Sequence, residues 1–254
     1  MSWSPRPQTQ QQQVGMLLIA AVIVTSGPGL PVVGYLLYPF TILTTWFHEM
    51  GHGLTALLMG LTFEELVIYP DGSGFAQSSG AQDPSALSSA LIAMGGPLGP
   101  SIAGSGLILA TGNHRFWRPA LYGLAAVIAL SVAIWVRSPV GLVVLPIVGA
   151  VMVVIALFGR DWMLRFSLQF LGVLAALSMF RDWDYLFTEN IVLGGEPMLS
   201  DTGAMEAALW LPHWFWAVII ILISGAMIGW SLKRALAEEG GPPRMPPRNI
   251  GQWL

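Results

Sequence analysis

Long apolar runs dominate this sequence, and they restrict the chain to folds that lie mostly in lipid. The clearest are residues 140–158 and 207–232, each about as long as the 20 or so apolar residues that a helix needs to cross a bilayer. Only 10% of the 254 residues are charged, whereas soluble domains carry about 25%. Such a chain could not cover a soluble surface with polar groups. The sequence therefore predicts an all-α polytopic membrane protein.

The number of spans follows from the positions of the runs. Candidate spans cover residues 14–27, 32–60, 85–110, 117–136, 140–158, 162–180 and 207–232. The first is short, and the second contains Pro39, which we expect to kink it. We therefore expect a bundle of six or seven transmembrane helices.

Two polar segments interrupt the apolar pattern. Between the second and third spans, "FEELVIY" and "GFAQSS" flank the turn signal "PDGSG", which predicts a small β-hairpin over residues 63–78. Residues 181–203 are expected to form a long polar loop.

The predicted domain organisation is one transmembrane domain, residues 14–236. A disordered tail, 1–13, precedes it, and a Pro- and Gly-rich tail, 237–254, follows. The net charge is −3 and no basic block is present, so we expect a lipid bilayer and no nucleic acid as partner. Cysteine is absent, so any metal must be held by His, Asp or Glu.

The motif His48-Glu49-Met50-Gly51-His52 lies inside an otherwise apolar run. Residues i and i+4 share one face of a helix, so both imidazoles can reach one Zn²⁺ ion. Glu49 lies about 100° further round, where it can act as a base toward water without binding the metal. Each ionisable group at mid-membrane costs about 2.5–3.5 kcal/mol. The three could be polar residues that satisfy one another, but a metal is the stronger explanation.

A catalytic zinc site needs a third protein ligand. His114 and His213 lie in short segments typical of a membrane interface. Asp182, Asp184 and Asp201 are better candidates, although Asp201 could equally be the N-cap of the last helix.

The segment "AMGGPLGPSIAGSG", residues 93–106, has two prolines and five glycines. We interpret it as the wall that packs against the histidine-bearing helix. Gly51 and Gly53 can let another helix approach closely, and the same closeness would leave room for a substrate backbone at the metal.

These features, in this order, resemble the site-2 protease family of intramembrane zinc metallopeptidases, in a compact branch without a PDZ domain. "FHEMGHGLTALLMG" is similar to its first motif, and "AMGGPLGP" to its Ala-Gly-Pro-x-x-Asn motif, with Pro100 in place of Asn. The family has a distal Asp, often in Leu-Asp-Gly, that completes the metal site. "LSDTG" is the best match here, which favours Asp201 over Asp182 and Asp184 as third ligand.

The sequence and the resemblance together predict an intramembrane zinc metalloprotease that cleaves a membrane protein substrate. One Zn²⁺ ion would be held by His48, His52 and Asp201, and Glu49 would be the catalytic base. The alternatives are a scaffold or chaperone that keeps the fold without turnover, and a metal transporter. We expect a multi-pass protein of a prokaryotic inner or cell membrane.

Overall fold

The fold is described from a computed structural model, which covers residues 31–181, 183–193 and 195–239, with Gly15, Ile19 and Val22. The predicted N-terminal tail, most of the predicted first span and nearly all of the C-terminal tail lie outside these residues. The α-helices are α2 (Pro31–Leu58), α3 (Ala86–Thr111), α4 (Trp117–Ile134), α5 (Pro139–Phe158), α6 (Asp161–Arg181), α7 (Trp183–Leu186), α8 (Asp201–Leu209) and α9 (His213–Glu239). The strands are β1 (Thr62–Ile68), β2 (Gly74–Ser79), β3 (Asn190–Leu193) and β4 (Glu196–Leu199), and a 3₁₀ turn, η2, covers His114–Phe116.

Four helical segments in the described part of the chain are long and apolar enough to cross a membrane: α3, η2 with α4, α5, and α9 up to Ala237. Helices α2 and α6 lie where spans were predicted but are not among the four. The predicted count of six or seven spans is therefore not confirmed.

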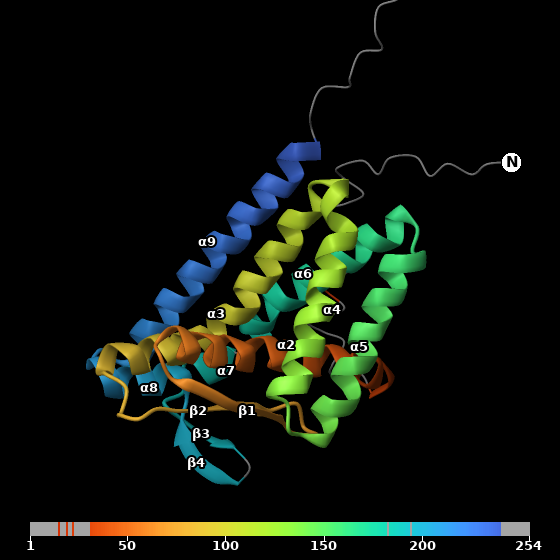
Figure 1. The fold of residues 1–254 in the computed structure, drawn as a ribbon. Coiled ribbons are helices and arrows are strands. Elements are labelled where there is room, and N and C mark those ends of the chain that lie inside the picture. The colour runs from red at the N-terminus through yellow and green to blue at the C-terminus, as the bar shows by residue number, and fades with distance from the viewer. Residues whose placement is uncertain are drawn as a thin grey trace, which may run out of the picture.

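Helix α3 is the centre of the bundle, where it packs against α2, α6, α8 and α9. Figure 1 shows α4, α5 and α9 running along the bundle, while α2 runs across its lower end. Pro39 lies inside α2, which continues as one helix through it. The largest buried cluster joins α2, β1, α3, α4, α5 and α6. Beside it, the Trp46 indole N–H donates to the Ser131 hydroxyl at 2.8 Å.

The predicted hairpin between the second and third spans is confirmed, because β1 and β2 pair antiparallel. Its turn is closed by Asp71, whose carboxylate accepts hydrogen bonds from the Ser73 N–H and hydroxyl, and by Gly72 at a φ of 89°. The outer side of β1 is also occupied, since Leu66 exchanges backbone hydrogen bonds with Trp135 and Arg137. In the described chain, the outer side of β2 has no strand partner.

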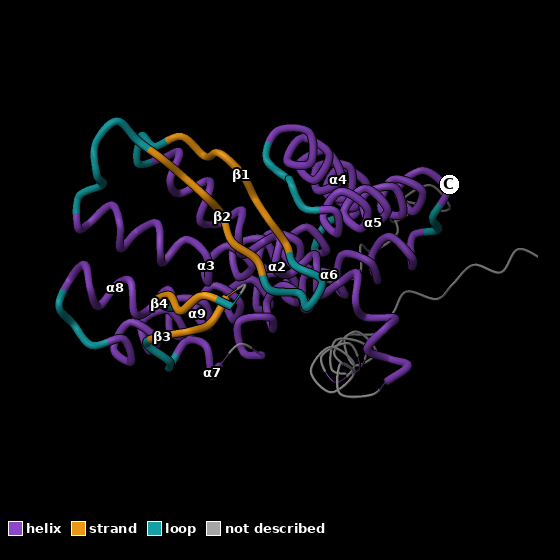
Figure 2. Tube along the Cα trace, turned by 90° about the horizontal axis from the view of Figure 1, so that it is seen from below, coloured by secondary structure: helices purple, strands orange, loops and turns teal. Residues whose placement is uncertain are grey.

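The segment expected as a polar loop, 181–203, is ordered into α7 and a second antiparallel hairpin, β3–β4. The expected span 207–232 also differs, because α8 ends at Leu209 and α9 starts after Pro212. Trp210 at this break adopts a φ of 67°. Figure 2 shows the two hairpins at the same end of the molecule, with β2 facing the β3–β4 side.

An arginine side chain caps the C-terminal end of α5. The Arg118 guanidinium, from α4, donates to the carbonyl oxygens of Ala156, Leu157 and Gly159. These carbonyls have no helical N–H partner at a helix C-terminus, so the arginine satisfies groups that lipid could not.

Candidate metal centre

Helix α2 carries the H-E-x-x-H motif on the side that faces α3 and the hairpins. The ring centroids of His48 and His52 lie 4.8 Å apart, as expected for one turn of helix. The Glu49 side chain is 5% exposed. The motif therefore lies inside the protein.

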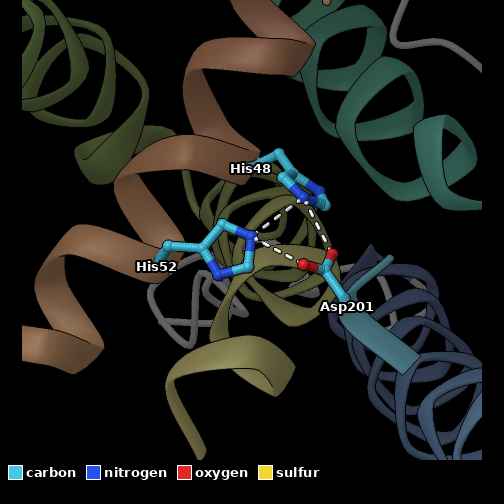
Figure 3. Close-up of side chains that lie close together, drawn as sticks. All are labelled: His48, His52 and Asp201. Atoms are coloured by element: carbon cyan, nitrogen blue, oxygen red, sulfur yellow. Dashed lines mark hydrogen bonds and ion pairs between the residues drawn. The ribbon is translucent and has the colours of Figure 1, made fainter. Parts of the chain in front are cut away.

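Asp201 reaches the histidines from α8, as Figure 3 shows. Its Oδ1 lies 3.1 Å from His52 Nε2, and its Oδ2 lies 3.1 Å from His48 Nε2. The alternative role as N-cap is wrong, because Ser200 is the cap and accepts the Gly203 N–H at 3.0 Å. Asp201 is instead the first helical residue, free to face α2.

Hydrogen bonds alone do not satisfy the polar atoms of His48, His52 and Asp201. His52 Nδ1 lies 2.8 Å from the Ile92 carbonyl oxygen, which can only accept, so neutral His52 carries its proton on Nδ1. Its bare Nε2 then lies 3.1 Å from Asp201 Oδ1 and 3.1 Å from His48 Nε2, with no proton of its own to donate to either atom. A tetrahedral metal with bonds of about 2.0–2.1 Å separates its ligand atoms by about 3.3 Å. The donors and their spacing therefore fit a metal ion.

Asp201 is also in the protonation state that a metal requires. Burial alone would raise the pKa of its carboxyl, but the positive charges that His52 and His48 carry when protonated outweigh burial and hold that pKa well below its usual range. The group is therefore an ionised carboxylate at neutral pH.

The Gly- and Pro-rich part of α3 forms the wall behind the histidines, as the sequence predicts. A Cβ on Gly96 would lie 2.1 Å from His52 Nε2, so the imidazole occupies the space that a side chain would fill. Gly51 approaches α3 just as closely, because a Cβ there would lie 2.1 Å from the Gly95 carbonyl oxygen. Gly53 faces the Phe63 ring. Both α2 glycines thus allow close packing. Protein atoms of α3 and Phe63 fill the space beside Gly51 and Gly53, where the sequence also allowed a substrate backbone.

Two cavities flank the motif, of about 350 Å³ and 550 Å³. The smaller one lies toward Thr45, Pro97 and Pro100, and the larger one toward β2, β4 and the start of α3. Five residues line both: His48, Glu49, Gly74, Tyr185 and Ile191. They form a waist between the cavities, and β2 passes close to the motif there, because a Cβ on Gly74 would lie 3.2 Å from Glu49 Cγ.

The sequence does not identify Tyr185 and Ile191 as residues of the site. Tyr185 Oη accepts the Asp201 N–H at 3.2 Å, and its ring centroid lies 6.1 Å from that of His48. Burial, and then the Asp201 charge, raise the pKa of this phenol, so it stays protonated. No spacing rule connects a tyrosine in "RDWDYL" to a motif far earlier in the chain, so the sequence offered no signal for it.

The other candidate ligands are not part of this cluster. His114 pairs with Asp161 at 3.3 Å, and His213 with Glu206 at 2.8 Å. Asp184 is exposed on α7. Asp182 lies outside the described residues.

Residues 14–231 match the model of a family described as peptidase M50B-like. The sequence has no match among curated proteins or among solved structures.

Proposed function

This chain belongs to the peptidase M50B-like family, as its resemblance to site-2 proteases implied, and on that premise we propose that it is a zinc-dependent intramembrane endopeptidase. The substrate would be a membrane-embedded segment of another protein. The observation that carries the proposal is the convergence of His48, His52 and Asp201, with buried Glu49 beside them.

His48, His52 and Asp201 would hold the ion. When bound, Zn²⁺ would polarise the scissile carbonyl and make a water molecule acidic enough to react at neutral pH. The Ile92 carbonyl orients His52 through its Nδ1–H, the kind of outer partner that metal-binding histidines usually have.

Glu49 would move the proton. It lines both cavities and is not among the three converging ligands, so its carboxylate is available to the attacking water. It would accept the water's proton as the oxygen attacks the carbonyl carbon, then deliver that proton to the amide nitrogen as the C–N bond breaks.

The two hairpins would hold the substrate in extended form. The outer side of β2 faces the larger cavity and can pair with an added strand, while β1 is already occupied on its outer side by Trp135 and Arg137. Ile191, Met198 and Leu199 of the second hairpin line the same cavity and offer apolar contacts suited to a membrane segment.

The test is zinc content and cleavage by detergent-purified protein. We expect about one zinc per chain in wild type and in Glu49→Gln, and loss of zinc in His48→Ala and Asp201→Ala. Exposed His114→Ala and Asp184→Ala are matched controls and should keep the metal. Wild type should cleave members of a proteome-derived peptide library, with new N-termini identified by mass spectrometry, and Glu49→Gln should cleave none.

Other results would change the conclusion. If wild type binds no zinc, the metallopeptidase proposal is wrong. If it binds zinc but cleaves no library peptide, the endopeptidase proposal fails and a scaffold that keeps the fold replaces it.

A further inference from the structure

The waist between the two cavities is where a scissile bond must lie if the chain is a peptidase. A peptide that passes from one cavity to the other contacts the five residues common to both. Of these, His48 and Glu49 already have proposed roles, Gly74 contributes backbone, and Ile191 is apolar. Tyr185 is the one remaining side chain with a proton to donate.

Hydrolysis of an amide places negative charge on the carbonyl oxygen, and enzymes stabilise it with fixed hydrogen-bond donors. Helix α3 offers no side-chain donor at the smaller cavity, where it contributes Pro97 and Pro100. This cavity does have four aliphatic hydroxyls, from Thr44, Thr45, Ser73 and Ser178. Each already donates to a protein acceptor: Thr44 and Thr45 to the Thr41 carbonyl, Ser73 to Asp71, and Ser178 to the Ala175 carbonyl.

Tyr185 differs from these hydroxyls in how it is held. Its Oη accepts the Asp201 N–H, which fixes the oxygen beside the proposed metal ligands, and its proton faces the Asp201 carboxylate until a substrate oxygen takes that place. Helix α7 is itself tied to α8, because the Thr202 hydroxyl donates to the Leu186 carbonyl at 2.9 Å. The donor is thus positioned before any substrate arrives.

We propose that Tyr185 is a catalytic residue that donates a hydrogen bond to the carbonyl oxygen of the scissile peptide as it becomes an oxyanion. This inference rests on the proposed peptidase function. The competing role is positional, in which the phenol only orients Asp201 and never touches substrate.

Tyr185→Phe distinguishes the two roles, because it removes the hydroxyl and keeps the ring. Loss of one oxyanion donor typically lowers kcat by about 10²–10³-fold. We expect that fall, with KM changed by less than about threefold and one zinc per chain retained. A phosphinic analogue of the best-cleaved library peptide, whose tetrahedral P–O⁻ imitates the oxyanion, should bind Tyr185→Phe more weakly by a similar factor. Tyr122→Phe, on α4 away from the waist, is the matched control and should match wild type.

Each other result overturns the inference in a recognisable way. Unchanged kcat and unchanged phosphinate affinity would show that the hydroxyl does not touch the reacting carbonyl. Loss of zinc in Tyr185→Phe would make Tyr185 a positioning residue for Asp201. If wild type with zinc cleaves no peptide, the proposed function fails first and this inference falls with it.

Discussion

The two halves of the metal centre are built in different ways. One half, His48 and His52, comes from a single helix turn, backed by glycines of α3 and oriented by the Ile92 carbonyl. The other half, Asp201, comes from the start of a nine-residue helix more than a hundred residues later. It is held by the Ser200 cap and the Tyr185 hydroxyl.

This difference shows where the centre is robust and where it depends on distant structure. The spacing of the histidines is fixed by helix geometry, so any fold that keeps α2 helical keeps it. The place of Asp201 depends on how α7, β3, β4 and α8 pack together, through bonds such as that from the Thr202 hydroxyl to the Leu186 carbonyl. Substitutions in the two halves should therefore fail differently.

The largest effect should follow from removing a ligand in either half. Loss of an outer-shell partner typically costs about 10–100-fold in metal affinity, and loss of a ligand should cost more. We expect both His52→Ala and Asp201→Asn to exceed 100-fold in zinc affinity, measured by competition with a chromogenic chelator. If Asp201→Asn lowers zinc affinity by less than about tenfold, the distant half is dispensable for metal binding.

A second substitution tests how tightly α3 supports the histidine half. In Gly96→Ala the new methyl would lie 2.1 Å from His52 Nε2, so the ring must move. We expect a loss of about 1–3 kcal/mol in stability, the usual cost of overpacking, and weaker zinc binding. Gly106→Ala, on the same helix with no atom within 4 Å of the new methyl, should leave zinc binding unchanged and should not lower stability, because Ala is the better helix former. Thermal unfolding with and without chelator measures both, and equal behaviour of the two variants would contradict the packing.

The smallest effect should come from replacing Ser200, the N-cap residue of α8 that directly precedes Asp201. Ser200→Ala removes the side chain that accepts the Gly203 N–H, which costs about 0.5–2 kcal/mol at a helix N-terminus. Ser85→Ala removes the equivalent cap of α3, a helix that carries none of the three ligands, and should cost a similar amount. We expect only Ser200→Ala to lower zinc affinity as well. If both variants lower it equally, the effect is on the fold as a whole and not on the distant half.

Much of the fold could be predicted from local pattern. The apolar runs located α3, α4, α5 and α6 within a few residues, and "PDGSG" located the turn of the first hairpin. The pair His48 and His52 followed from helix periodicity, and the wall at Gly95 and Gly96 from composition. All of these depend on neighbours in sequence or on one helix face.

The remainder required contacts between distant segments. Residues 181–203 have no long periodic run, so a four-residue helix and two four-residue strands could not be distinguished from a loop. Local pattern could not decide between cap and ligand for Asp201. Ser200 precedes it and competes for the same N–H groups, and only packing against α2 selects the outcome. Tyr185 became significant for the same reason, through its hydrogen bond to Asp201.

The arginine that closes the end of α5 also indicates the depth of the metal centre. Helix α5 has 20 residues, a rise of about 30 Å, which is close to the hydrocarbon thickness of a bilayer. Arg118 therefore marks one boundary, and Arg137, which precedes the other end of α5, marks the opposite one. Strand β1 is bonded to Arg137 and Trp135, so the hairpin and the motif beneath it lie toward that second boundary. Ser79, Gln82 and Asp83 line the larger cavity and would give water a polar route to the site from that side. If the proposed function holds, a substrate helix would need to unwind only near its end.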